Sequence, residues 1–225
     1  MTQTELLSKE EIALIIDEAE RTDEFDYMLF LTLKTTGRRI GELYGVEEIT
    51  EIGKKMVGKK IIYINGERTE VDKTAPIYKK SGHWIYGVKV KDIDLEKGTM
   101  KVYVLKRRQY IQDETILLPE VVRVISQYIK KNRLNLDDYV FRKKKRTMRQ
   151  IQNRIKMYAR KTGINKRVTI HNFRHYFITE LKRRGWSDDK IIKLTGHRSA
   201  QVLRIYDHIV ATDLREEAME SIRDL

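Results

Sequence analysis

The 225-residue chain contains no cysteine. This absence excludes disulfide bonds, thiol catalysis and cysteine-ligated zinc, and it is compatible with the cytosol. Long hydrophobic runs are also absent: the longest mostly apolar stretch, Tyr27–Leu33, falls far short of the ~20 residues that a membrane-spanning helix needs. The N-terminal residues Met1–Glu5 lack both the basic segment and the apolar segment of a secretory signal. We therefore expect a cytoplasmic protein without a membrane partner.

Sequence patterns of metal and nucleotide sites are lacking too. The chain has no His-Glu-x-x-His spacing and no glycine-rich phosphate-binding loop. We therefore expect neither a metal site nor a cofactor.

Positive charge is abundant but unevenly distributed. The chain carries 46 Lys and Arg against 33 Asp and Glu, and residues 141–185 alone hold 16 basic side chains and one acid, Glu180. A segregated basic region on an otherwise nearly neutral chain is typical of a protein that binds a polyanion. The densest part leads into a helical pattern that starts near Met148, so we predict a loop and helix face that follow phosphates; a merely solvated loop is the alternative. The predicted phosphate-contacting residues are Arg142, Lys143, Lys144, Lys145, Arg146 and Arg149.

Helical patterns occupy both ends of the chain. Ser8 and Glu11 form a capping-box pattern that predicts a helix over Lys9–Glu20, and Gly37 is a typical end for a second helix over Glu24–Thr36. Apolar periodicity beyond Pro119 predicts further helices. Their expected ranges are Glu120–Arg133, Met148–Thr162, His171–Arg184, Asp188–Leu194 and a last helix from Thr212 or Asp213.

Strand patterns occupy the middle of the chain. Asn65-Gly66 between two β-prone runs is a strong hairpin signal, and Ser81-Gly82 suggests a second ribbon, so we expect an inserted β-ribbon segment at about 46–88. Three strand-like runs follow, at Gly87–Val90, Lys101–Leu105 and Thr115–Leu118. The sequence therefore predicts an α+β fold, mostly α, with a small antiparallel three-stranded sheet. No linker interrupts it, so residues 1–225 are expected to form a single domain.

Two short motifs bring together side chains that can bind a phosphate. His171 and Arg174, at positions i and i+3 in the first turn of a predicted helix, share a face where free N–H groups also favour an anion. His197 follows the turn-forming Gly196, and Tyr206 lies nine residues further on. Each motif alone is common by chance, and most tyrosines are packing residues. The hypothesis of a phosphate site depends on their occurrence together and in this order.

These motifs carry a family resemblance. Thr36–Leu43, read as T-G-R-R-I-G-E-L, resembles the first arginine box of tyrosine recombinases, T-G-x-R-[VI]-x-E-L. His171–Phe177 resembles their H-x-L-R-H-x-F box, and Leu194–Ser199 followed by Tyr206-Asp207-His208 is similar to their L-G-H-x-S…Y-x-H ending. Asp92–Asp94 and the hairpin after it resemble the family's sheet, which carries a lysine. The resemblance covers about residues 7–45 and 87–210 and implies the catalytic domain of phage-type integrases and site-specific recombinases.

The resemblance also assigns site residues. Arg38 occupies a variable position of the first box. Lys106 aligns best with the family's lysine, with Arg107 and Lys101 as alternatives, and Glu42 is expected to brace the site. The residues implied to be catalytic are Arg39, Lys106, His171, Arg174, His197 and the nucleophile Tyr206.

The activity implied by the resemblance is DNA strand cleavage and rejoining through a 3′-phosphotyrosyl intermediate, which requires neither metal nor ATP. The arginines and His197 would stabilise the charge on the phosphate, and Lys106 would protonate the departing 5′ oxygen. His171 would take the tyrosine proton, although an imidazole that only hydrogen-bonds the phosphate would have the same sequence pattern. The implied partners are double-stranded DNA and further copies of the chain in a synaptic tetramer; a monomer without DNA is equally compatible. The implied location is the nucleoid.

Two alternatives and two departures from the family remain at this point. A type IB topoisomerase-like strand transferase shares the chemistry, and a non-catalytic DNA-binding recombinase paralogue would explain the basic region equally well. The segment at 46–88 interrupts the usual short link between the arginine box and the sheet, and its lysines suggest extra DNA contact, a partner surface or a mere surface excursion. The N-terminal core-binding domain usual in the family is expected to be absent.

Overall fold

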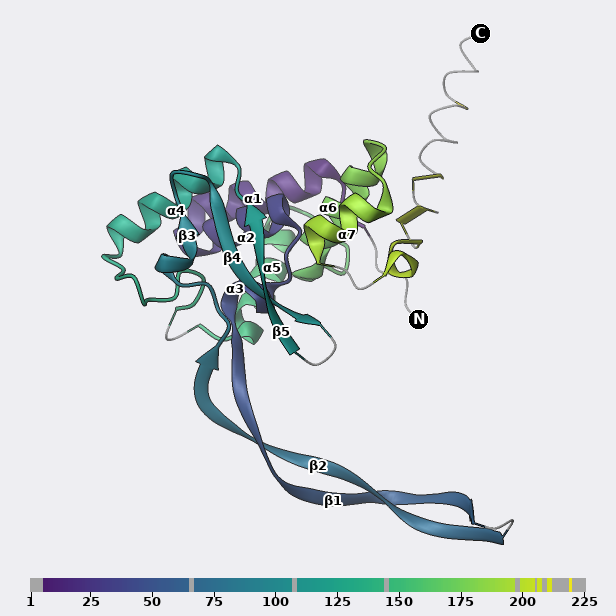
Figure 1. Cartoon of the computed structure of the whole chain (residues 1–225). Helices are drawn as coiled ribbons and strands as arrows, with labels where there is room; N and C mark the ends of the chain where they lie inside the picture. The colour runs from purple at the N-terminus through teal and green to yellow at the C-terminus, as the bar shows by residue number, and fades with distance from the viewer. Residues whose placement is uncertain are drawn as a thin grey trace. The chain divides into compact units, whose positions relative to one another are not determined.

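The computed structural model describes residues 6–64, 67–106, 109–143, 146–196, 199–204, 206–207, 210, 211 and 219. The chain forms two compact units. The main unit comprises Met1–Gly45 and Tyr86–Leu225, and the second unit, Val46–Ile85, is hereafter called the arm. Figure 1 shows the helices of the main unit and the two long strands of the arm.

The helices of the main unit begin and end within a few residues of their predicted bounds. None of the described helices has the length and apolar character needed to cross a membrane. A five-residue helix that begins inside the arginine box, α3, was not predicted, and most of the predicted last helix lies outside the described residues. The helices are α1 (Lys9–Thr22), α2 (Glu24–Thr36), α3 (Ile40–Tyr44), α4 (Pro119–Lys131), α5 (Met148–Lys161), α6 (His171–Arg183) and α7 (Asp188–Thr195), with 3₁₀ turns at Val90–Asp92 and Ala200–Leu203.

Helix α2 is the centre of the main unit. Its residues are apolar on nearly all sides, as expected of a buried helix, and α1, α4 and α6 pack around it. The Phe30 ring lies 5.3 Å from the ring of Phe173 on α6 and meets the edge of Tyr158 on α5 at 6.0 Å. The aromatic contacts therefore join α2 to α5 and α6, two helices of the basic region 141–185.

The end of α2 determines how closely α6 approaches. Gly37 adopts a left-handed conformation, with φ 61° and ψ 12°, which ends the helix as predicted. A Cβ atom at Gly37 would lie 2.3 Å from the ring of Phe177, so only glycine fits between α2 and α6 here. This contact brings the arginine box and the His171–Phe177 box together.

The small antiparallel sheet has the strand order β3-β4-β5, formed by β3 (Ile93–Asp94), β4 (Thr99–Lys106) and β5 (Gln109–Ile116). Two predicted strands were misplaced. Gly87–Val90 is not a sheet strand, because Val88 N–H donates to the Leu43 carbonyl and Val90 begins a 3₁₀ turn. The third strand is β5 rather than Thr115–Leu118. Its apolar residues Ile111 and Ile116 are 46% and 68% exposed while the polar Thr115 is buried, so its sequence lacks the apolar alternation that marks a strand.

The arm is one long antiparallel hairpin of β1 (Val46–Ile64) and β2 (Glu67–Ile85) (Figure 1). The predicted hairpin at Asn65-Gly66 agrees with this pairing, although these two residues lie outside the described ones. The predicted second ribbon at Ser81-Gly82 is wrong. Both residues belong to β2, where the pairing register with β1 shifts between Glu47 and Ile49. A Ser-Gly pair occurs at such bulges as well as in turns, so it did not distinguish the two.

Candidate active site

The arginine box forms a corner between α2 and α3 in which two adjacent arginines have opposite environments. The Arg38 side chain is fully buried, and its Nη1 donates to the Asp113 carboxylate at 2.9 Å while its Nη2 donates to the Glu114 carbonyl at 3.0 Å. The Arg39 side chain is 41% exposed. Its Nη1 lies 3.0 Å from Glu42 Oε1, and its backbone N–H donates to the other oxygen of the same carboxylate. Arg38 thus anchors the corner to β5, whereas Glu42 orients an accessible Arg39.

Helix α6 places Arg174 beside this corner. Arg174 is buried, and its Nη1 donates to the Gly37 carbonyl at 2.6 Å. Desolvation and the positive charge of Arg39 lower the pKa of Arg174 to about 10, so it stays a cation at neutral pH. Desolvation and the charges of Arg174 and Arg39 also lower the pKa of His171. The structure therefore brings together three of the predicted site residues: Arg39, His171 and Arg174.

Tyr206 reaches the same site from the C-terminal part of the chain. It is buried against Ile178, Ile191 and Leu203. Burial raises the pKa of its hydroxyl to about 12, against the opposing influence of Arg174 and Arg39. Both arginines therefore act electrostatically on the tyrosine that the sequence identified as the nucleophile.

A second histidine of α6 contacts the tyrosine. His175 Nδ1 lies 2.7 Å from the Tyr206 hydroxyl, and the two ring centroids are 5.7 Å apart. Desolvation and the neighbouring His171 and Arg174 lower the pKa of His175, so its imidazole is neutral at neutral pH and Nδ1 can accept a hydrogen bond in the appropriate tautomer. Sequence reasoning overlooked His175. The available signal was its position four residues after His171, on the same helix face.

The remaining two predicted catalytic residues are only partly described. Lys106 is the last residue of β4 and pairs with Gln109, but its side chain and residues 107–108 lie outside the described ones. The alternative Lys101 pairs with Glu114 near the opposite end of β4. His197 also lies outside the described residues, but its neighbour Gly196 does not.

Gly196 packs tightly against the arginine corner and the sheet. It ends α7 in a left-handed conformation, with φ 69°. A Cβ atom added there would lie 3.3 Å from Val104 Cγ1 and 3.4 Å from Arg38 Nη1. The absence of a side chain at Gly196 therefore brings the backbone that leads to His197 against β4 and Arg38.

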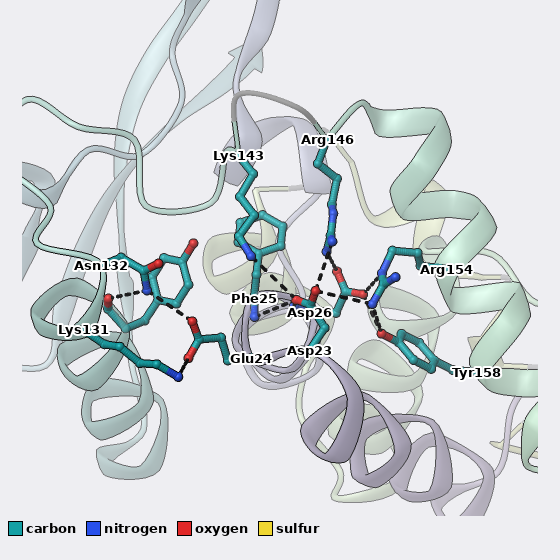
Figure 2. A network of polar contacts seen from close by, with 11 residues as sticks. Asp23, Glu24, Phe25, Asp26, Lys131, Asn132, Lys143, Arg146, Arg154 and Tyr158 are labelled. Atoms are coloured by element: carbon teal, nitrogen blue, oxygen red, sulfur yellow. Dashed lines mark hydrogen bonds and ion pairs between the residues drawn. The ribbon is translucent and has the colours of Figure 1, made fainter.

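The basic segment, Arg142–Arg149, is less available than its composition suggests. Arg146 donates to the Asp26 carboxylate at 2.6 Å and to that of Asp23 at 3.0 Å, and its side chain is 18% exposed. Lys143 Nζ lies 3.9 Å from the Asp23 carboxylate and 5.2 Å from the centre of the Phe25 ring. Figure 2 shows both cations directed at these α2 residues. The structure thus gives Arg146 an internal ion pair in place of the solvent-facing position that sequence reasoning assumed.

The other residues of the basic segment differ in their surroundings. Arg149 on α5 is exposed. The Arg142 guanidinium lies 5.5 Å from the centre of the Tyr139 ring, in a half-buried position. Lys144 and Lys145 lie outside the described residues. Arg149 is therefore the clearest candidate for a phosphate contact among the described members of the segment.

Asp26 is the centre of the network that holds Arg146. Its carboxylate is fully buried, and besides Arg146 it accepts a hydrogen bond from Tyr158 at 2.7 Å and one from Arg154 (Figure 2). Burying a carboxylate is costly unless cations and donors surround it, as they do here. The network therefore fastens α5 and the end of the basic segment to α2.

The fold and the gathering of two arginines, two histidines and a tyrosine agree with the recombinase resemblance of the sequence. A comparison of the chain with models of known protein families leads to the same class. The model of the phage integrase family matches residues 83–212. This range is more than half of the 225 residues, and the chain belongs to the phage integrase family.

Among the described residues, no group of three or more histidine, aspartate or glutamate side chains is placed to hold a metal ion.

Curated relatives are similar over part of their length. Tyrosine recombinase XerA of Saccharolobus solfataricus is 32% identical over 142 residues, which cover 61% of this chain and 44% of the relative. XerA of Pyrococcus furiosus is 32% identical over 136 residues, covering 57% and 46%. The virulence plasmid integrase pGP8-D of Chlamydia trachomatis is 28% identical over 142 residues, covering 61% and 42%. The matched part is thus less than half the length of each relative.

Solved structures show the same fold. The crystal structure of XerA recombinase covers 97% of this chain, which spans 66% of that one, with a TM-score of 0.64 and 23% identity. The XerH recombinase bound to a palindromic difH substrate in a post-cleavage complex gives a TM-score of 0.61 at 17% identity, covering 95% of this chain and 52% of that one. The predicted fold class and the family resemblance are therefore confirmed.

Proposed function

We propose that this chain is the catalytic domain of a tyrosine-type site-specific recombinase or integrase that cleaves and rejoins double-stranded DNA. The observation that carries the proposal is the convergence of Arg39, Arg174 and Tyr206, from three separate parts of the chain, on one site. The arginines influence the ionisation of the tyrosine, as cations placed to bind a phosphate beside it would. The family membership supports the same chemistry.

The arginines are suited to stabilise the charge that develops on the phosphate. Arg174 is held by the Gly37 carbonyl and Arg39 by Glu42, so both guanidinium groups are oriented before substrate arrives. Arg39 is also accessible. In the proposed step the Tyr206 oxygen forms a bond to phosphorus while the bond from phosphorus to the 5′ oxygen breaks, which yields a 3′-phosphotyrosyl intermediate.

The tyrosine must lose its proton in this step, and its raised pKa means that a base is required at neutral pH. Sequence reasoning gave this role to His171. The 2.7 Å contact with Tyr206 supports His175 as the acceptor, which leaves His171 to donate to the phosphate. His175→Ala should then slow adduct formation by roughly 10²–10⁴-fold at unchanged DNA affinity. A slowing seen only in His171→Ala would return the role to His171.

The remaining assignments complete the proposal. Lys106 would protonate the departing 5′ oxygen, and His197 would add a donor to the phosphate, because Gly196 leads the chain toward Arg38. We extend the proposal to a single catalytic domain over 1–225 that carries the arm as an insert. The proposal includes that the chain acts as a tetramer on DNA and that it is located in the cytoplasm, in association with the nucleoid. Lambda integrase, a protein of similar fold, was crystallised as a dimer bound to a core site.

The test is covalent trapping of the full chain on a nicked DNA substrate. The expected product is a protein–DNA adduct that survives denaturant and maps to Tyr206. Tyr206→Phe should abolish the adduct and leave DNA affinity nearly unchanged, because only one hydroxyl is lost. Tyr176→Phe, on the same helix α6 as His175, is the matched control and should retain the adduct. DNA binding without any adduct would instead identify a non-catalytic paralogue.

A further inference from the structure

The described side chains of the arm form no core of their own. Its strands are 19 residues long, and the side chains described between Glu51 and Ile61 of β1 are all exposed. The opposite strand is exposed or half-buried between Glu70 and Lys79 wherever its side chains are described. An isolated two-stranded ribbon with both faces in solvent is marginally stable. A partner that covers one face would stabilise it, and the distribution of charge indicates which face and which partner.

The two faces of the arm differ in charge. Paired residues of an antiparallel ladder share a face, and successive pairs alternate between faces. One face, the lysine face, carries four lysines and no carboxylate across five successive pairs. These pairs are Lys60–Val71, Gly58–Lys73, Lys55–Ala75, Gly53–Ile77 and Thr50–Lys79.

The opposite face has balanced charge. It carries lysines together with acids, and Lys59 Nζ lies 3.1 Å from the Glu70 carboxylate. Its pairs are Ile61–Glu70, Lys59–Asp72, Met56–Thr74, Lys54–Pro76 and Glu51–Tyr78. The two faces alternate along the same strands, but over these five pairs only the lysine face carries lysines without carboxylates.

The dimensions of the lysine face suit a nucleic-acid backbone. Pairs on one face recur about every 6.7 Å, so the five pairs span roughly 27 Å. Along duplex DNA this length corresponds to the rise of about eight nucleotides of one strand. Three of the four lysines face a small or apolar residue across the ladder, Gly58 opposite Lys73, Ala75 opposite Lys55 and Val71 opposite Lys60, so no carboxylate competes for them on this face. Flexible lysines reach phosphates without a fixed bonding geometry, which favours contact independent of base sequence.

We propose that the lysine face of the arm, formed by Lys55, Lys60, Lys73 and Lys79, binds the phosphate backbone of duplex DNA. This is a DNA contact separate from the candidate active site. The proposal shares its ligand with the proposed function, but it does not depend on Tyr206 or on strand cleavage.

The test compares two double variants of the full chain with the same change in net charge. Lys60→Gln with Lys73→Gln alters adjacent pairs of the lysine face, and Lys54→Gln with Lys59→Gln alters the opposite face. The measurement is DNA affinity by fluorescence anisotropy over a salt series, on two duplexes of unrelated sequence. The lysine-face variant should lower the slope of log affinity against log salt by roughly 1.8, about 0.9 per lost contact, on both duplexes. The opposite-face variant should change the slope much less.

Several outcomes would overturn the proposal. Equal slope changes in the two variants would mean that net charge, and not the lysine face, matters. Unchanged slopes together with weaker self-association of the lysine-face variant in sedimentation would identify a second copy of the chain as the partner. The adduct assay separates this proposal from the proposed function: at saturating protein and low salt the lysine-face variant should still form the Tyr206 adduct. Loss of the adduct with an unchanged slope would also contradict the proposal.

Discussion

The arginine corner at 37–42 and the basic segment at 142–149 both present clustered cations, but the structure uses them differently. At the corner one arginine, Arg38, is buried against Asp113, and the next, Arg39, is 41% exposed beside the candidate nucleophile. In the basic segment Arg146 is paired with Asp23 and Asp26 on α2. The comparison teaches that a local count of cations does not identify those that bind a ligand. Each of the three arginines pairs with an acid, and they differ in exposure: Arg39 stays 41% exposed beside Glu42, whereas Arg38 is buried and Arg146 is 18% exposed.

The largest effect is expected from the acid that organises the basic segment. Asp26→Asn would leave Arg146 and Arg154 close together without their buried counter-charge, so the free energy of unfolding should fall by about 3–5 kcal/mol. Chemical denaturation followed by circular dichroism measures this loss. Asp17→Asn, on an exposed position of α1, is the matched control and should stay within about 0.5 kcal/mol of the unaltered chain. Similar stability of the two variants would show that the network contributes little.

The next effect separates the two arginines of the corner. Arg39→Ala should slow adduct formation by roughly 10²–10³-fold without lowering the melting temperature much, because it removes an accessible phosphate ligand. Arg38→Ala should instead destabilise the fold by about 3 kcal/mol, because Asp113 loses its buried partner. Adduct kinetics and thermal denaturation of both variants check this prediction. The assignment is reversed if Arg38→Ala stays folded but inactive while Arg39→Ala remains active.

Sequence signals succeeded where the responsible interaction is local. The capping box at Ser8 and Glu11 is present, and the glycine that ends α2 has the expected left-handed backbone. The arginine motif favours Arg39 over Arg38 because it is specific to position, and this choice stays a prediction; Arg39 is the accessible one of the two side chains.

Sequence signals failed where a partner lies far along the chain. Arg146 pairs with Asp26, 120 residues away, and His175 contacts Tyr206, 31 residues away, so neither partner is visible in the local sequence. In β5 the polar Thr115 is buried while the apolar Ile111 and Ile116 are exposed, so the sequence shows no apolar alternation there, and the predicted position of this strand was wrong. The Ser81-Gly82 pair lies at a bulge of the arm, and because its sequence resembles that of a turn, one long hairpin was predicted as two ribbons.

A smaller effect distinguishes structural from DNA-binding cations within the basic segment. Arg149→Ala should lower the salt slope of DNA binding by about 0.9, because it removes one exposed phosphate contact, and should leave stability nearly unchanged. Arg146→Ala should lower the melting temperature and leave the slope nearly unchanged, because its charge is already paired. Anisotropy titrations and thermal denaturation give both quantities. A full loss of slope in Arg146→Ala would show that its aspartates release it to DNA.

The smallest effect concerns His171 and His175 of α6 and can be followed by NMR titration of their imidazoles. Arg39 lowers the pKa of His171 but does not contribute to the lowered pKa of His175, which follows from desolvation, His171 and Arg174. In Arg39→Ala the pKa of His171 should therefore rise toward its usual 6.5, while that of His175 should stay nearly constant as an internal control.

The same shift has a consequence for stability. Because the folded state binds these protons more weakly than the unfolded state, stability is fully present above pH 6.5 and is lost as the pH falls through 6.5 toward the lowered pKa values. Arg39→Ala should lessen this loss, since the folded His171 then accepts its proton more readily. The measurement is the free energy of unfolding between about pH 5 and 7. If the pKa of His171 is the same in both proteins, the charge of Arg39 does not act on His171, and this prediction is wrong.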